Sequence, residues 1–133
     1  MPAPFVHLRV HSAYSLAEST LRLKSIVALA GGDSQPAVAI TDTNNMFGAL
    51  EFSEKMRGSG VQPIIGLECI IADSRGRGEV VLLAQSEAGY EALCRHNSRA
   101  LLDVEGGDDP MIQLESLAQD NEGMILLLSL IHI

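Results

Sequence analysis

Cysteine is scarce in this sequence, which contains only Cys69 and Cys94 among its 133 residues. Two cysteines are too few for a disulfide framework, and their spacing forms no CxxC pair of the kind that binds zinc. The first ten residues also lack the basic and then apolar segments of a secretory signal peptide. We therefore expect a cytoplasmic protein in which both thiols are reduced and serve as ordinary core residues.

Positive charge is scarce as well. The sequence has 9 lysine and arginine residues against 17 aspartates and glutamates, which gives a net charge of −8 at neutral pH. A protein that binds nucleic acid needs a basic face to neutralise the phosphates. The basic residues here are scattered in pairs, so the composition argues against DNA binding by this segment on its own.

Several recognisable features are absent altogether. No apolar run is long enough to cross a bilayer, so a membrane protein is not expected. The sequence contains no P-loop, no GxSxG turn and no dinucleotide-binding glycine motif, and it has no internal repeat. What remains is a chain with 47% hydrophobic residues, which is enough for one modest domain with its own core.

Strand and helix signals alternate along the chain. Apolar runs bounded by turn residues predict strands, and serine caps followed by apolar periodicity and terminal glycines predict helices. The order predicts an α/β architecture with a largely parallel sheet. The predicted elements are strand 5–10, helix 19–32, strand 36–41, helix 47–60, strand 61–73 with a kink near Pro63 and Gly66, strand 79–85, helix 86–102, short helix 112–119 and strand 123–130.

Polar side chains collect where the predicted strands end. His11 follows the first strand, Asp42 and Thr43 follow the second, and Glu68 lies on the third. In folds of this class, ligands bind at the carboxyl ends of the strands. The sequence therefore predicts one site assembled from three strand ends.

The sequence stops inside the apolar stretch "LLLSLIHI", residues 126–133, without a helix cap or a polar tail. We expect the chain to be the N-terminal piece of a longer protein, with residues 129–133 as a non-native end.

Four stretches carry a family resemblance: "FVHLRVHSAYSL", "AITDTNNMFGALEF", "QPIIGLE" and "VVLLAQSEAGYEALCR". In order and spacing they resemble the N-terminal PHP (polymerase and histidinol phosphatase) domain of the bacterial DNA polymerase III alpha subunit, most strongly over residues 5–102. The resemblance implies the first part of a distorted (β/α) barrel, with residues 1–133 forming a partial PHP domain. In intact members a cluster of metal ions lies at the carboxyl ends of the strands.

The resemblance also assigns the metal-site positions, and several of them are altered. The first histidine of the family's His-x-His pair falls on Arg9 and the second on His11. Arginine stays protonated and has no lone pair for a metal. The next ligand, an aspartate, falls on Glu18. The family's Asp-His pair becomes Asp42-Thr43, and its bridging glutamate is Glu68. The implied site is vestigial. No metal is expected, and any ligation would come from His11, Glu18 and Glu68.

Plain structural roles compete with these assignments. We expect an ion pair between Arg9 and Glu68 in place of the missing cations. His7 is predicted to be packed and hydrogen-bonded, and His96 to be an exposed helix residue. Asp42 and Asn45 can each satisfy a turn through side chain to backbone hydrogen bonds.

Three functions follow as hypotheses. In the first, the chain is a catalytically degenerate scaffold at the start of a replicative polymerase, docking the proofreading exonuclease. Its other partners are the rest of the polymerase chain and further replicase subunits. DNA is bound through the parent chain, whose polymerase site holds Mg²⁺; the fragment itself has no cofactor and is inactive alone. The second hypothesis is a stand-alone metal-dependent PHP phosphoesterase, and the third is a binding module without a catalytic parent.

Overall fold

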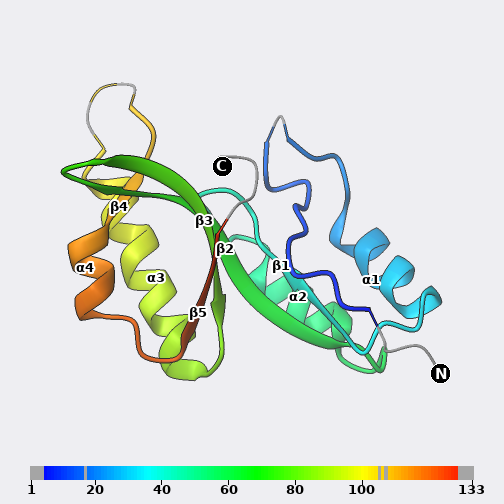
Figure 1. Cartoon of the computed structure of the whole chain (residues 1–133). Coiled ribbons are helices and arrows are strands. Elements are labelled where there is room, and N and C mark those ends of the chain that lie inside the picture. The colour runs from blue at the N-terminus through cyan, green and yellow to red at the C-terminus, as the bar shows by residue number, and fades with distance from the viewer. Residues whose placement is uncertain (1–4, 17, 105, 107, 129–133) are drawn as a thin grey trace.

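The computed structural model describes residues 5–16, 18–104, 106 and 108–128. Helices and strands alternate within these residues (Figure 1), so the predicted α/β class is confirmed. The elements are α1 (Leu23–Gly32), β1 (Ala37–Ile40), α2 (Ala49–Met56), β2 (Gln62–Asp73), β3 (Gly76–Ala84), α3 (Glu87–Leu102), β4 (Met111–Gln113), α4 (Leu114–Gln119) and β5 (Met124–Leu128). The first two residues of the predicted short helix thus belong to a three-residue strand, β4, which precedes α4. The expected non-native end at 129–133 lies outside the described residues.

β2 is the central strand of the sheet, and the strand that pairs with it changes along its length. Residues Gln62–Ile65 pair in parallel with β1, and Gly66–Asp73 pair antiparallel with β3. β4 adds a second parallel pairing to β2, and β5 pairs antiparallel with β3. The sheet is therefore mixed where a largely parallel one was predicted. The reason is the tight turn between Asp73 and Gly76, because strands joined by so short a connection must run antiparallel.

The strand predicted to have a kink near Pro63 and Gly66 is continuous in the structure. Pro63 and Gly66 both lie within the continuous β2, and the change of partner occurs between them. A Cβ atom on Gly66 would lie 2.7 Å from the Leu82 carbonyl oxygen. Glycine at this position therefore allows β3 to approach β2 closely.

The predicted first strand, residues 5–10, is not a regular strand. It makes one isolated parallel bridge, from His7 to Val38. Two backbone bonds hold it beside β1: the Ala39 N–H donates to the His7 carbonyl, and the Thr41 N–H donates to the Val10 carbonyl. The two donors are two residues apart along the chain, whereas the two acceptors are three residues apart. The N-terminal segment therefore has one extra residue opposite β1, as in a β-bulge.

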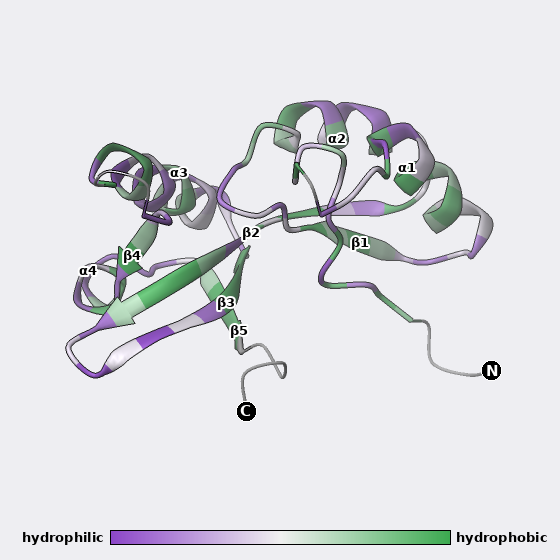
Figure 2. Cartoon of the chain, turned by 90° about the horizontal axis from the view of Figure 1, so that it is seen from above, coloured by the Kyte–Doolittle hydropathy of each residue, from purple (hydrophilic) through white to green (hydrophobic). Residues whose placement is uncertain are grey.

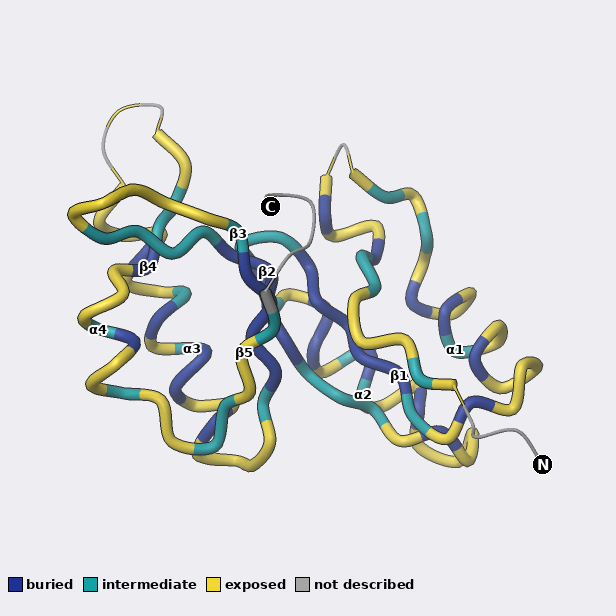
Figure 3. Tube along the Cα trace, viewed as in Figure 1, coloured by how far each residue is buried: buried dark blue, intermediate teal, exposed yellow. Residues whose placement is uncertain are grey.

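The helices bury one face of the sheet and leave the other to the site. Figure 2 shows α1, α2 and α3 along the same side of the strands. In Figure 3 the buried strand residues lie in β1 and in the central parts of β2 and β3. Leu67 and Cys69 pack in the core beneath α3 and α4. Side chains alternate along a strand, so Glu68, which lies between them, points to the opposite face.

Candidate functional site

The backbone brings the residues after β1 beside the middle of β2. Thr43 forms an isolated parallel bridge with Glu68. The Asn44 N–H donates to the Glu68 carbonyl at 2.9 Å, and the Glu68 N–H donates to the Asp42 carbonyl at 3.1 Å. These bonds extend the parallel pairing of β1 and β2 beyond the end of β1, and they place two of the predicted site positions side by side.

A compact ionic cluster surrounds the Glu68 carboxylate. The Glu68 side chain is only 6% exposed. Its Oε1 atom pairs with the Arg9 guanidinium, and its Oε2 atom pairs with His11 Nε2. On the other side of the imidazole, His11 Nδ1 lies 3.2 Å from Glu18 Oε2. The predicted ion pair between Arg9 and Glu68 is therefore confirmed, and His11 lies between two carboxylates.

Thr43 takes part in the same cluster through its hydroxyl. This group donates to Glu18 Oε2 at 2.6 Å and lies 3.3 Å from Glu68 Oε2. The resemblance places a histidine ligand at this position. Here the residue instead donates its single hydroxyl proton, and the shorter contact assigns that hydrogen bond to Glu18.

Asp42 has a different role from the rest of the predicted set. Its side chain is buried and accepts three hydrogen bonds, from the Ser12 N–H at 2.6 Å, the Ser12 hydroxyl at 2.7 Å and the Ser15 hydroxyl at 2.7 Å. It does not line the cavity that contains Arg9, His11 and Glu68. Asp42 therefore joins the loop after residue 11 to the end of β1 through hydrogen bonds. These bonds fix the position of the chain next to His11.

The cluster opens into a cavity of about 460 Å³. Its wall also contains Asn44, which follows β1 next to Thr43, and two residues that the sequence did not point to, Glu79 and Asp109. Glu79 faces Ile70 in the β2–β3 ladder, so knowledge of that register would have identified it. Asp109 follows α3 in the chain, and no local signal marks it. Most charged groups around the cavity are carboxylates.

Cys69 also lines this cavity but is not an activated thiol. Burial, and then the neighbouring Glu68 charge, raise the pKa of Cys69 to about 12. A thiol of this kind is protonated at neutral pH and is a poor nucleophile and metal ligand. The expectation of a core thiol is confirmed for Cys69, whereas Cys94 is half-buried.

Three side chains could together hold a metal ion. His11, Glu18 and Glu68 each offer one ligand atom, and these atoms lie within 4.8 Å of one another. The set does not fit a metal cluster, however, because the permanently charged Arg9 guanidinium pairs with Glu68 Oε1 and places a positive charge beside the candidate ligands. Polynuclear sites depend on a full ligand set with supporting hydrogen bonds.

His7 and His96 differ from their predictions. His7 is exposed, and its ring contacts Phe5 edge-on at a centroid distance of 4.6 Å, so the packed and hydrogen-bonded role is wrong. His96 is only 4% exposed, and its Nε2 lies 2.7 Å from the Asp120 carbonyl oxygen, so the prediction of an exposed residue is also wrong. The turn role of Asn45 is confirmed by its side chain, which donates to the Tyr14 and Thr43 carbonyls and accepts from the Phe47 N–H.

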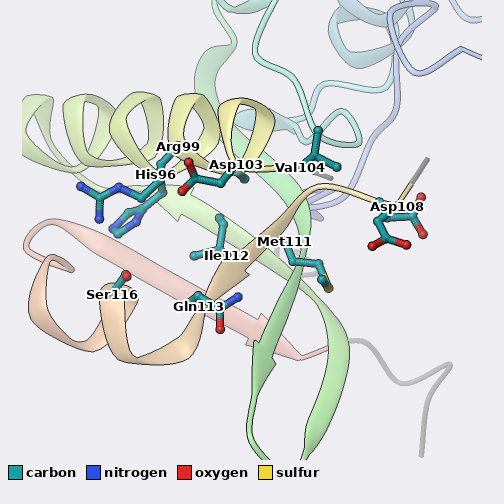
Figure 4. Close-up of a pocket in the computed structure, with 11 residues that line it drawn as sticks. His96, Arg99, Asp103, Val104, Asp108, Met111, Ile112, Gln113 and Ser116 are labelled. Atoms are coloured by element: carbon teal, nitrogen blue, oxygen red, sulfur yellow. The ribbon is translucent and has the colours of Figure 1, made fainter. Parts of the chain in front are cut away.

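Figure 4 shows the surroundings of His96. A second cavity, of about 220 Å³, lies between α3 and the β4–α4 segment, and His96 and Arg99 project from α3 toward α4. The Asp120 carboxylate binds Arg95 through two bonds of 2.9 and 3.0 Å. Asp120 therefore accepts bonds from two α3 side chains, which tether the end of α4 to α3.

Comparison with known proteins identifies the sequence family. A profile of the PHP domain matches residues 7–132. The chain is 37% identical over 130 residues to DNA polymerase III subunit alpha of Pseudomonas fluorescens, an alignment that covers 96% of this chain. It is 40% identical over 131 residues to the same subunit of Caulobacter vibrioides, with 92% of this chain covered. The chain spans only 11% and 12% of the length of these curated relatives.

Solved structures agree on the fold. A protein from Bifidobacterium adolescentis assigned as a metal-dependent phosphoesterase matches with a TM-score of 0.59 and 18% identity, covering 74% of this chain and 34% of that one. An amidohydrolase from Chromobacterium violaceum, with bound sulfate and no metal, matches with a TM-score of 0.57 and 20% identity, covering 71% and 32%. None of the helices in the described part of the chain is both long and apolar enough to cross a membrane.

Proposed function

This chain belongs to the PHP domain family, and from that membership we propose that it is the N-terminal PHP segment of a replicative DNA polymerase III alpha subunit. The proposal is supported by the identity to alpha subunits across nearly the whole chain and by the small share of their length that it spans. The parent, a cytoplasmic DNA-directed DNA polymerase, would bind DNA and add deoxynucleotides to a primer. Its Mg²⁺ would be held by carboxylates outside this chain.

In this proposal the segment's own PHP site is catalytically degenerate. The observation that carries this part is the Arg9–Glu68 ion pair within the cluster of candidate ligands. A guanidinium remains protonated at any physiological pH and cannot ligate a metal. It supplies the positive charge that the buried Glu68 needs, so the carboxylate is balanced without a cation.

The segment then serves as a scaffold in the replicase. It would stabilise the polymerase chain to which it is joined, and offer a docking surface to the proofreading exonuclease and to other replicase subunits. Support for a structural role comes from how the site residues are used, since Asp42, Thr43 and Arg9 all make hydrogen bonds or ion pairs that join separate segments of the chain.

Two measurements on the full-length parent test the proposal. Primer extension with Mg²⁺ should be robust, and an inactive parent would contradict the polymerase assignment. After equilibration with zinc and removal of the excess, metal analysis should find well under one equivalent of zinc at the PHP segment. A tightly held stoichiometric metal that disappears in a Glu68→Gln variant would contradict the degenerate site.

A stand-alone metal-dependent PHP phosphoesterase is the second candidate. The convergence of His11, Glu18 and Glu68 within 4.8 Å favours it. It requires ligands at the positions of Arg9 and Thr43, neither of which can supply an imidazole. Hydrolysis of p-nitrophenyl phosphate that depends on added manganese or zinc and on Glu68 would support this candidate over the first.

A further inference from the structure

The cavity of about 220 Å³ between α3 and the β4–α4 segment has a lining of its own, separate from the ionic cluster of the PHP site (Figure 4); we call it the α3–β4 cavity. Its apolar walls include Val104, Met111 and Ile112. Asp109 lines both this cavity and the PHP cavity, so the two are neighbours. Small-molecule sites combine apolar walls with a few polar groups, and those polar groups decide which ligand fits.

Carboxylates are the main charged groups of the α3–β4 cavity. Three aspartates line it: Asp103, Asp108 and Asp109. Arg99 is the one permanently charged cation among its described lining residues. The Arg99 charge also acts on Asp120, whose pKa is lowered mainly by the hydrogen bonds from Arg95 and further by Arg99. The cavity therefore has an excess of negative charge, which attracts cations.

A buried nitrogen atom adds a hydrogen-bond acceptor to these carboxylates. His96 lines the cavity and is only 4% exposed, and its Nε2 lies 2.7 Å from the Asp120 carbonyl oxygen. A carbonyl oxygen only accepts, so Nε2 carries the proton of the neutral ring and Nδ1 carries the lone pair. Nδ1 has no hydrogen bond to another residue in the described part of the chain. A ligand with an N–H group would satisfy this acceptor.

The acceptors of the cavity are spread along its length. In the described ranges, the side chains that bring three metal-ligating atoms close together do not include any from this cavity. Asp103, the C-cap of α3, follows His96 by about two helical turns, or about 10 Å. Figure 4 shows Ile112 and Met111 between His96 and Asp108. A ligand that reaches these acceptors together is therefore elongated, with N–H groups at its ends and an apolar middle.

From the spaced carboxylates and the free acceptor of His96 we infer that the α3–β4 cavity binds a short aliphatic diamine. One ammonium group faces Asp108, and the other faces Asp103 and His96 Nδ1. The alkyl chain between them lies against Met111 and Ile112. This binding site goes beyond the proposed function and does not depend on the polymerase assignment.

The test measures the binding of radiolabelled 1,4-diaminobutane to the full-length parent chain by equilibrium dialysis at low salt. Asp103→Asn removes one charge without changing the size of the side chain and should weaken binding about fivefold or more. Asp33→Asn is the matched control, because Asp33 is the exposed C-cap of α1, has nearly the same backbone angles as Asp103 and does not line the cavity. The control should bind like the wild type.

A second variant tests the buried acceptor. His96→Gln keeps an N–H group that can reach the Asp120 carbonyl but removes the Nδ1 lone pair, and it should weaken binding about threefold or more. Because His96 is buried, the unfolding temperature of this variant is measured beside its affinity. If the variant is unfolded, Asp103→Asn decides the question, since Asp103 is exposed.

A second ligand tests the requirement for two charges. Butylamine has the same alkyl chain with one ammonium group, and it should bind about tenfold or more weakly than the diamine. Equal affinities of the two amines would contradict a site with acceptors at both ends. A wild-type chain without saturable diamine binding would overturn the inference, as would equal affinities of the Asp103→Asn and Asp33→Asn chains. None of these results bears on primer extension, which tests the proposed function separately.

Discussion

Arg9 forms an ion pair with Glu68, and this pair joins the irregular N-terminal segment to the middle of β2. The two side chains differ in exposure, since that of Arg9 is 37% exposed and that of Glu68 only 6%. The carboxylate is thus the buried partner. The Arg9 guanidinium supplies the fixed positive charge beside it, and the His11 imidazole lies against its other oxygen.

Removal of Arg9 should therefore destabilise the domain. A fully buried ion pair that loses one partner costs about 3–5 kcal/mol. Arg9 is partly exposed and His11 still faces Glu68, so we expect about 1–3 kcal/mol for Arg9→Ala. The measurement is urea unfolding, followed by circular dichroism, of a protein that contains the complete domain.

Two further variants make that measurement specific. Arg9→Ala combined with Glu68→Gln should recover part of the lost stability, because the uncompensated charge is gone. Arg75→Ala is the control, since Arg75 is 85% exposed and pairs with Asp73 in its own turn, and it should change stability by less than about 0.5 kcal/mol. An Arg9→Ala protein as stable as the wild type would mean that the ion pair contributes nothing.

Restoring imidazoles should restore metal binding. The double variant Arg9→His, Thr43→His adds two neutral ligands beside His11, Glu18 and Glu68 and removes the guanidinium. We expect it to bind zinc and to unfold at a higher temperature when zinc is present. The double variant Arg9→Ala, Thr43→Ala also removes the guanidinium but adds no ligand, and zinc should not raise its unfolding temperature. Equal responses of the two variants to zinc would contradict the vestigial-site interpretation.

Asp42 should matter for stability through its hydrogen bonds. The carboxylate is buried and accepts three bonds from Ser12 and Ser15. Asp42→Ala leaves those donors without an acceptor and should cost about 2–4 kcal/mol. Asp108→Ala, at an exposed aspartate, is the control and should be nearly neutral. The midpoint of urea unfolding measures the stability of both variants. An unchanged midpoint for Asp42→Ala would mean that the Asp42 hydrogen bonds do not stabilise the domain.

The two cysteines should differ in reactivity. With a pKa of about 12, Cys69 has about one thiolate in 10,000 molecules at pH 8. Iodoacetamide should therefore modify the half-buried Cys94 well before Cys69 in the native protein, which peptide mass mapping can follow. In urea both should react at similar rates, and fast native modification of Cys69 would contradict the raised pKa.

The raised pKa of Cys69 also predicts that the folded protein becomes less stable at high pH. A thiol in the unfolded chain ionises near pH 8.5, whereas the folded thiol stays protonated to about pH 12. The contribution of Cys69 to stability is therefore complete below about pH 8.5 and declines as the pH rises toward 12. A Cys69→Ala variant should lose this part of the pH dependence.

Local chemistry was enough to predict much of this molecule. The helix at 86–102 was identified from its serine cap, and the structure has Ser86 accepting a hydrogen bond from the Gly89 N–H at the start of α3. The inability of Arg9 to bind a metal follows from the guanidinium alone. The meeting of Arg9 with Glu68 was predicted from the family pattern, in which both positions contribute to one site.

Other features depended on contacts between distant segments, which local patterns do not encode. His96 lies on a helix that also has exposed polar residues, yet it is buried, and its ring contacts the Asp120 carbonyl that follows α4. β2 reads as one apolar run, yet its first part pairs with β1 and its later part with β3 and β4. Asp109 joins the cavity wall although it is 41 residues beyond Glu68 in the chain.

The physical reason is the range of the interactions. Caps, turns, side-chain periodicity and the protonation of arginine are properties of a few neighbouring residues, so the sequence by itself determined the order of most helices and strands and the inability of Arg9 to bind a metal. Burial and strand pairing depend on which segments fill the same space. The tertiary structure alone decided the mixed sheet, the tether at His96 and the acidic wall of the cavity.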